Sequence, residues 1–561
     1  MSEAQARQPE QAIPVSAAAK AALLPLALAQ FLCSYAGSSL AVAIDPISQD
    51  LNTTVTGVQT AITVFTLTMA ALMIPGSKLT DIWGRKRTFL IGMVVYAAGA
   101  LVAGLAPSMG FLYLGYSIGQ GVGTALLIPP VYILVTVLFT DFRSRAAAFG
   151  TVMAAAGLGS ASGPLIGGII TTVASWRVTF FTQVLLAVVI IYMSRRIQDV
   201  PVVGTKPVLD VGGAFISGAG LVLVVVGLLL ASTYGWVTSR QDFVIGNTVV
   251  IPEGGISPVL IFVAAGLVVL WLFLRYISAR EASGKEPLVK PHVLANPVAN
   301  IALATQICQW FIILGGNFVF ATYLQVALGM SPIETGLRLT PATIGILLTS
   351  RMAGRLTARR SQRTLILAGF AFAAVGIVLM LLLSPGDTTG WALAPGLFVL
   401  GMGAGIMLTP SVNVVQSSMP EEDQADISGV SRALSNLGSS LGTAVAGAVL
   451  VGSIIAGVTV GMAEANPPLP PTVQTQINTW LDEGSVSAVS DAQVEAALQG
   501  QPQAVIDQVV QLNAEARNQA LARAMVVVGL VALLGLVLVL VAPGRHRALT
   551  ATEESPAAPA S

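Results

Sequence analysis

Charged residues are scarce in this sequence: they make up 10% of its 561 residues, whereas 54% of the residues are hydrophobic. Soluble globular proteins carry about a quarter charged residues, so this chain has too few polar groups to cover a surface exposed to water. A lipid bilayer tolerates such a composition. The net charge of +1 gives no electrostatic basis for binding nucleic acid, and we expect no such partner.

Cysteine and histidine are nearly absent, with two of each. Cys33 and Cys308 lie far apart inside apolar runs, which favours free buried thiols over a disulfide. His292 and His546 are isolated in polar segments, so we expect no metal site and no cofactor. The sequence also lacks a nucleophile or acid–base constellation and the phosphate-binding loop G-x-x-x-x-G-K-S/T. These absences argue against an enzyme and against an ATP-driven pump.

Long apolar runs are what the sequence has in abundance. A helix that spans the membrane needs about 20 mostly apolar residues. Runs of this kind predict an all-α membrane protein with fourteen spans, at 21–44, 58–77, 88–106, 111–139, 146–172, 178–195, 211–232, 258–277, 298–326, 336–353, 364–384, 391–415, 427–456 and 521–542.

The basic residues are distributed unequally between the two sides that this topology defines. An even number of spans places both termini on one side, and 23 of the 28 Lys and Arg residues fall on that side, counting Arg432 with its loops. Cytoplasmic loops carry an excess of Lys and Arg, so both termini are predicted to be cytoplasmic. The same asymmetry supports the count, because a missed span would have mixed the two sets.

An internal repeat divides the chain. Glycines at 119, 121 and 123 are followed by Pro129, and glycines at 401, 403 and 405 are followed by Pro410, about 282 residues later. The loops after spans two and ten, and the glycines of spans five and thirteen, repeat at nearly the same distance. We therefore expect two pseudo-symmetric six-helix bundles with two transmembrane helices inserted between them, an arrangement that many secondary transporters use for alternating access.

These repeats and spans predict the following segments: a cytoplasmic N-terminal tail at 1–20, a first bundle at 21–197, the inserted helices and linkers at 198–290, a second bundle at 291–542 and a cytoplasmic tail at 543–561. Within the second bundle, segment 457–520 is predicted to lie outside the cytoplasm. Its capping box at Ser490 and Gln493, and a helix start at Pro502, indicate two short amphipathic helices over the external mouth or on the membrane surface. A passive spacer is the alternative.

Two motifs carry a family resemblance. The loop after span two contains Gly76, Asp81, Gly84, Arg85, Lys86 and Arg87, and span five contains Gly159, Gly163, Pro164, Gly167 and Gly168, followed by Trp176-Arg177. With the Gly329-x-Ser331-Pro332 turn after span nine, they make the chain resemble the fourteen-span drug:proton antiporters of the major facilitator superfamily. The resemblance covers nearly the whole sequence and implies a multidrug exporter in the inner membrane of a bacterium.

The loop motif is interpreted as a latch at the cytoplasmic mouth. Asp81 can pair with nearby basic residues or lie against a helix N-terminus, and both interactions can break when the bundles separate. Gly76 and Gly84 permit a tight turn. A simple topology signal would explain the cations but not the carboxylate and the two glycines. In span five, the glycines let helices approach closely, either for general packing or for a role specific to exporters.

Polar and aromatic residues on spans one, four, nine and twelve are the candidates for the substrate path. Buried amides are costly in hydrocarbon, so they face either a ligand or a neighbouring helix. The candidates are Gln30, Ser34, Tyr35, Ser38, Tyr116, Gln120, Gln309, Trp310, Asn317 and Asn413. Such a set predicts a small hydrophobic substrate held by aromatic and amide contacts rather than by ion pairing.

Two residues that the family associates with proton coupling are missing. Ala36 stands at the acidic position of span one, and Ser117 stands where span four usually has Arg. Asp45, near the outer end of span one, is the remaining candidate proton site. Pro46 directly after it favours the alternative that Asp45 only ends the helix.

Export of hydrophobic or amphipathic compounds by a monomer surrounded by membrane lipids, driven by the proton gradient, is the predicted function. A dedicated exporter of a lipid or self-made metabolite, and a transporter-derived membrane sensor, are the alternatives.

Overall fold

The computed structural model describes residues 17–40, 43–53, 55–139, 141–195, 197, 208–245, 248–384, 389–465, 467–482, 494–496 and 498–541. The capping box at Ser490 and Gln493 lies outside these residues, as do the tail at 543–561 and most of the predicted N-terminal tail. Ala17 to Lys20, assigned to that tail from the sequence, already belong to the first helix.

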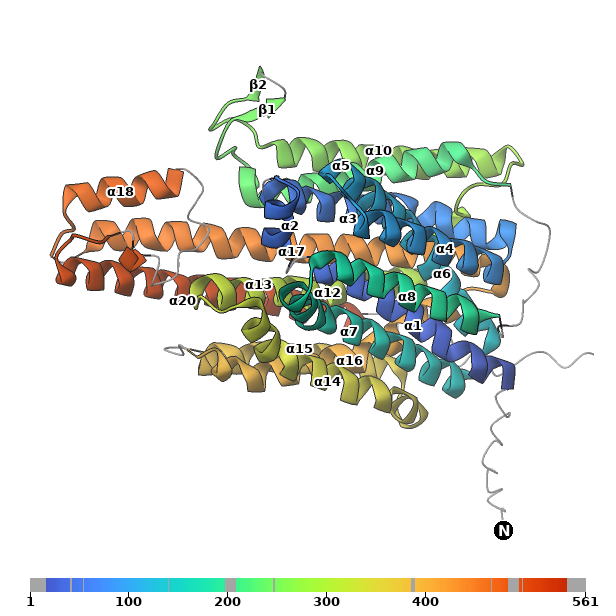
Figure 1. Cartoon of the computed structure of the whole chain (residues 1–561). Coiled ribbons are helices and arrows are strands. Elements are labelled where there is room, and N and C mark those ends of the chain that lie inside the picture. Colours follow the sequence, from blue (N-terminus) through green and yellow to red (C-terminus); the bar gives the residue numbers. More distant parts are fainter. Residues whose placement is uncertain are drawn as a thin grey trace, which may run out of the picture.

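Helices form nearly all of the described chain (Figure 1). The first bundle contains α1 (Ala17–Ser39), α2 (Ile44–Asp50), α3 (Val55–Trp83), α4 (Arg85–Gly104), α5 (Met109–Leu112), the π-helix η2 (Tyr113–Gln120), α6 (Gly121–Leu138), α7 (Phe142–Val173) and α8 (Trp176–Ser194). The insertion contains α9 (Val211–Tyr234), the antiparallel strands β1 (Phe243–Ile245) and β2 (Thr248–Ile251), and α10 (Pro258–Ala282).

The second bundle follows a short helix, α11 (Pro291–Ala295). It contains α12 (Pro297–Trp310), the π-helix η3 (Phe311–Gly315), α13 (Gly316–Thr322), the π-helix η4 (Tyr323–Ala327), α14 (Pro332–Arg359), α15 (Gln362–Leu383), the 3-10 helix η5 (Trp391–Leu393), α16 (Ala394–Ser417), the 3-10 helix η6 (Glu421–Asp423), α17 (Gln424–Glu464), α18 (Pro471–Asp482) and α20 (Gln503–Val541).

Thirteen helical stretches among the described residues are long and apolar enough to cross a membrane. They match every predicted span except the one at 336–353. Helix α14 covers that segment and has the length of a span, but Glu334 and Arg338 near its start and Arg351 near its end lower its hydropathy. It packs against α7 and α16, while Leu337, Ile344, Leu348 and Met352 are exposed on the rest of its surface. The all-α fold with two six-helix bundles is confirmed, and the count of fourteen is consistent with it.

The two bundles pack their glycines in equivalent ways. In the first, Gly92 and Gly99 of α4 lie against the span formed by η2 and α6 so closely that a Cβ would overlap its backbone. In the second, Gly369 and Gly376 of α15 lie in the same way against α16. Small residues let helix backbones approach this closely. Helix α9 of the insertion contacts both α3 and α17, so it bridges the two bundles along one side.

The region before the last span differs from the prediction of two short amphipathic helices. The first, expected between Ser490 and Gly500, is described only in part, with helix at 494–496, and α18 was not predicted. The second, expected to start at Pro502, is present but does not end before the membrane. It continues as α20 to Val541 without a break, so the last predicted span, at 521–542, forms the second half of one long helix. At 1.5 Å per residue, 41-residue α17 and 39-residue α20 each reach about 60 Å, twice the hydrocarbon thickness. They pack together and extend beyond the other helices (Figure 1).

Candidate functional site

The predicted loop motif lies where α3 and α4 meet the start of α17. Gly84 has φ +95°, a backbone conformation that favours glycine, and forms the turn between the two helices. A Cβ at Gly76 would lie 2.6 Å from the Ala125 carbonyl oxygen, so glycine allows α3 to contact α6. Arg85 is buried and pairs with Glu421 of the second bundle at 3.0 Å. Lys86 Nζ donates to the Arg195 carbonyl within its own bundle, and Arg87 is exposed.

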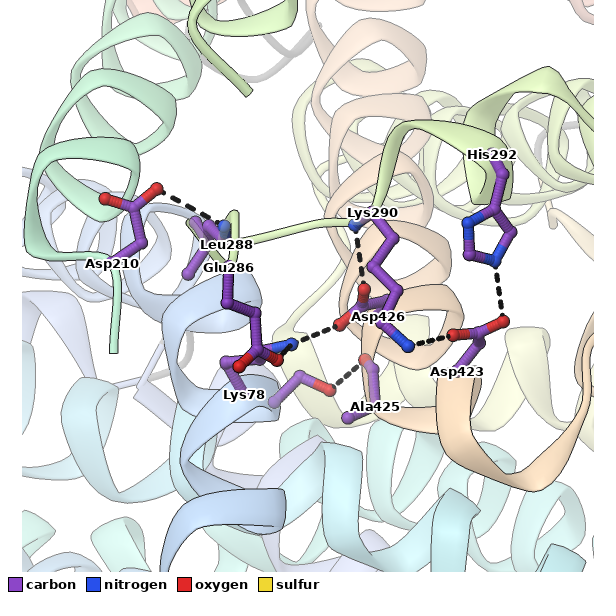
Figure 2. Close-up of polar contacts among 10 residues, drawn as sticks. Lys78, Asp210, Glu286, Leu288, Lys290, His292, Asp423, Ala425 and Asp426 are labelled. Carbon is purple, nitrogen blue, oxygen red and sulfur yellow. Dashed lines mark hydrogen bonds and ion pairs between the residues drawn. The ribbon is translucent and has the colours of Figure 1, made fainter. Parts of the chain in front are cut away.

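Lys78, which the sequence analysis did not select, is the cation that joins the bundles here. It is 3% exposed and lies 3.3 Å from Asp426 of α17 and 3.2 Å from Glu286 of the linker after α10 (Figure 2). The Ser77 hydroxyl donates to the Ala425 carbonyl next to it. Three segments of the chain therefore meet at one buried ammonium group.

The linker adds a second set of pairs on the same helix end (Figure 2). Lys290 donates its backbone N–H to Asp426 at 2.8 Å, and its Nζ lies 2.7 Å from Asp423. His292 Nε2 lies 2.7 Å from the other oxygen of Asp423. Burial works to lower the pKa of Lys290, but the Asp423 carboxylate outweighs it and the pKa is raised. We call Lys78, Arg85, Lys290, His292 and their acidic partners the ion-pair latch.

Asp81, the carboxylate of the predicted motif, is buried beside the ion-pair latch but takes no part in its ion pairs. The bonds from this loop to the second bundle and the linker are therefore made by Lys78 and Arg85, not by its carboxylate. No pattern within the loop indicated that Lys78 would pair with the second bundle. Its partner Asp426 lies 348 residues away, and only the fold brings the two together.

The glycines of span five use both faces of α7. On one face, a Cβ at Gly159 or Gly163 would overlap Phe31 or Ser38 of α1, and Gly167 contacts Ser39. On the other face, a Cβ at Gly168 would touch Ile333 of α14 in the second bundle. Helix α7 thus packs between the bundles, with its glycine ladder against α1. Pro164 lies within α7, and its side chain is not among those that the structure describes.

Several substrate-path candidates lie together in the first bundle. Tyr116 and Gln120 lie on η2, and π-helical segments are frequent at functional sites. Gln120 Nε2 and the Tyr96 hydroxyl both donate to Gln183 Oε1 at 2.7 Å. Tyr96 and Gln183 were not predicted, because a single glutamine in an apolar run shows no pattern. On α1, Gln30 and Tyr35 are buried, while Ser34 and Ser38 are partly exposed, and Ser38 bonds to backbone carbonyls.

The candidates of the second bundle divide into three groups. Gln309 and Trp310, at the end of α12, are brought toward the first bundle, since Trp310 packs against its core. Asn413 on α16 accepts a hydrogen bond at 3.1 Å from Arg145 of α7, so it joins the bundles directly. Asn317 is exposed on α13 and belongs to neither group.

Arg432 is the residue that the sequence analysis placed differently. It was counted with the loops, but it lies two turns inside α17 and is 6% exposed. Its guanidinium donates to the Tyr132 hydroxyl of α6 at 3.0 Å and stacks over the Tyr132 ring at 4.6 Å. The Trp310 ring of α12 lies 5.5 Å away. Arg432 thus sits between the bundles. In the sequence, a single arginine next to an apolar run indicates the end of a span, so Arg432 was assigned to a loop. Its burial becomes apparent only from the packing of the helices.

The outer end of the first bundle holds the predicted proton site and its neighbour. Asp45 lies on α2, separate from α1, and its side chain is not among those described. Asp50, at the end of α2, accepts from Trp176 Nε1 at 3.1 Å and pairs with Arg177. The Trp176-Arg177 dipeptide that follows the span-five motif is therefore an anchor for α2.

Comparison with known proteins places this geometry among transporters. The profile of the Major Facilitator Superfamily matches residues 26–239 and 211–443. The puromycin resistance protein pur8 of Streptomyces alboniger is 30% identical over 78% of this chain and 84% of its own length. The cephamycin export protein CmcT of Amycolatopsis lactamdurans is 29% identical over 76% and 83%. The crystal structure of the human organic anion transporter MFSD10 superposes with a TM-score of 0.54 at 10% identity, over 93% of this chain and 99% of that one, which shows the shared fold alone.

Proposed function

This chain belongs to the drug-efflux proteins of the major facilitator superfamily, and on that premise we propose that it moves hydrophobic or amphipathic compounds out of a bacterial cell by alternating access. It is a multi-pass membrane protein that transports small compounds and is not an enzyme. The proposal adds the substrate class, the bacterial inner membrane, cytoplasmic termini, a monomeric state among membrane lipids and the mechanism.

One observation carries the mechanism: the polar bonds between the bundles are gathered toward one end. In the described part of the chain they are the bonds of Ser77, Lys78 and Arg85 to η6 and the start of α17, those of Arg145 to Asn413 and Ser417, and that of Arg432 to Tyr132. The outer ends carry bonds within a bundle, such as Asp50 with Arg177. A transporter closed by ion pairs at one end is arranged to open at the other.

The distribution of Lys and Arg supports assigning the closed end to the cytoplasm. The conformation described here is then the one that is closed toward the cytoplasm. Opening toward the cytoplasm must break the ion-pair latch, and substrate entering between the bundles compensates for part of that cost.

Proton coupling is also part of the proposal. Asp45 remains the candidate proton site, and Asp81 is the buried carboxylate closest to the ion-pair latch. Ala36 and Ser117, where the family has its coupling residues, favour the second candidate function, a dedicated exporter of a lipid or self-made metabolite.

Transport of a compound panel in cells that lack the chain, with and without its expression, tests the proposal. We expect lower accumulation of several hydrophobic compounds in expressing cells, and loss of the difference when a protonophore is added. Equal accumulation of every compound, at confirmed expression in the membrane, would contradict export. A difference that persists with the protonophore would remove proton coupling and leave export in place.

A further inference from the structure

Arg432 has no acidic partner in the part of the chain that the structure describes. Among the described residues its hydrogen bonds go to two hydroxyl groups, Tyr132 at 3.0 Å and Ser435 at 3.2 Å, and its other neighbours are the aromatic rings of Tyr132 and Trp310. Arginine remains protonated in proteins, so this 6%-exposed side chain is a fixed positive charge. Buried charges are normally paired, and hydroxyls and ring faces compensate a guanidinium only in part.

Hydrogen-bond donors without acceptors surround the same place. Trp310, whose ring faces the guanidinium, has a buried Nε1–H without a partner in the described part of the chain. Asn436 lies one turn after Arg432 on the same face of α17, and its Nδ2 is likewise buried and unbonded. Gln306 lies one turn before Trp310. Its Oε1 accepts a hydrogen bond from Ser431, but its Nε2 has no acceptor among the described residues. A cation and several N–H groups without acceptors form a site that lacks an anion.

The position of Arg432 explains how such an anion arrives. Trp310 belongs to the same bundle as Arg432, whereas Tyr132 belongs to the other. When the bundles separate at the cytoplasmic end, the Tyr132 bond is lost and the guanidinium keeps only Trp310 and Ser435 near it. A group entering from that side meets an arginine that has just lost its strongest neutral acceptor.

On the basis of the proposed export function, we propose that Arg432 binds the anionic group of the transported compound, a carboxylate carried on an aromatic or amphipathic body. The planar guanidinium matches a carboxylate in two parallel hydrogen bonds. The apolar residues packed around Tyr132 and Trp310, such as Phe149 and Val412, suit the body of the same molecule. This adds an ion pair to the aromatic and amide contacts expected from the sequence.

Two probes of the same shape test the proposal: anthraquinone-2-carboxylate and anthraquinone-2-carboxamide, titrated against the full-length transporter in lipid nanodiscs. We expect the wild type to bind the carboxylate about tenfold more tightly than the carboxamide. Arg432→Gln should abolish this preference while the affinity for the carboxamide changes by no more than about twofold. Arg432→Lys, which keeps the charge but loses the planar fork, should give an intermediate preference.

Arg145→Gln is the matched control, because it removes a cation at the same interface whose bonds go to Asn413 and Ser417. It should retain the preference for the carboxylate. If Arg432→Gln does not fold, Trp310→Phe replaces it: loss of the Nε1–H should reduce the ratio of the carboxylate affinity to the carboxamide affinity.

Equal affinity of the wild type for the two probes would overturn the assignment of the anion and leave export of hydrophobic compounds standing. A preference that survives Arg432→Gln would overturn it as well. A chloride ion is the other anion that could occupy the site, and a competition experiment distinguishes it from an organic carboxylate. If chloride at cytoplasmic concentration displaces neither probe, the site takes organic carboxylates. Chloride binding that depends on Arg432, without a preference for the carboxylate probe, would contradict the proposal. Binding of neither probe, with no export of any compound in cells, would remove the proposed function too.

Discussion

The ion-pair latch and the surroundings of Arg432 are both buried polar regions between the same two bundles, yet their polar groups are satisfied to different degrees. Lys78, Lys290 and Asp426 in the latch are each paired, and Asp426 receives bonds from two directions. Around Arg432, one cation has neutral partners, and several amide and indole N–H groups have no acceptor among the described residues. The ion pairs of the latch are formed and stabilise this conformation, although Arg85 Nε is buried without an acceptor among the described residues. The central region holds a cation without an ion pair and gains from a ligand. Substitutions in the two regions should therefore have opposite effects on stability.

Lys78→Ala should have the largest effect. Its removal leaves Asp426 buried without its ammonium partner, and breaking a buried pair from one side costs about 3–5 kcal/mol. We expect a lower Tm and a large loss of transport. Lys78→Met combined with Asp426→Leu removes both charges and should recover most of the Tm while transport stays low. Failure of the double variant to recover the Tm would mean that Lys78 stabilises the fold by other contacts.

Asp81→Asn should reduce transport strongly, by about tenfold, and change the Tm less than Lys78→Ala does. The reason is that Asp81 is buried beside the latch but takes no part in its ion pairs, so loss of its charge acts on the moving interface rather than on an existing bond. The comparison requires equal amounts of protein in the membrane. Undiminished transport would reduce the loop motif to a topology signal.

Gln309→Leu should shift stability in the opposite direction. The Nε2 and Oε1 atoms of Gln309 are buried without hydrogen-bond partners in the described structure. An apolar side chain of similar size therefore removes an uncompensated desolvation cost of about 1 kcal/mol. We expect an unchanged or higher Tm together with weaker transport. A clear fall in Tm would show that the amides near Arg432 are hydrogen-bonded in the ligand-free transporter. The two regions would then not differ in how their polar groups are satisfied.

Asp50→Asn should have the smallest effect of the four. Asp50 is 45% exposed in its pair with Arg177, and an exposed pair contributes about 0–1 kcal/mol. We expect a slightly lower Tm and nearly normal transport. Asp45→Asn, its neighbour on α2, should instead weaken the dependence of transport on the pH gradient if Asp45 carries the proton. Identical pH profiles of the two variants would leave Asp45 as a structural residue.

Much of the fold could be predicted from the sequence because apolar length, the internal repeat and the loop charges are local or periodic signals. Helix α18 was not predicted. The helix start at Pro502 was predicted, but its continuation into the last span as α20 was not, since an amphipathic helix that runs into a span shows no break. Fewer residues of the candidate site could be predicted, because their roles depend on contacts between residues that are distant in the sequence. Gly159 and Gly163 follow a spacing that sequence shows, whereas Lys78 acquires its meaning from Asp426, and Arg432 from Tyr132, across 300 residues or more of chain.

Distances between spin labels test the central claim, that the latch holds the bundles closed at the end where the termini lie. Labels at exposed Arg87 and Glu422 report that end, and labels at exposed Ser108 and Thr389 report the other, in a background without Cys33 and Cys308. In the wild type we expect a short distance for the first pair. With Lys78→Ala, the first distance should lengthen and the second should shorten. If both distances stay unchanged, or both lengthen together, the latch does not control alternating access.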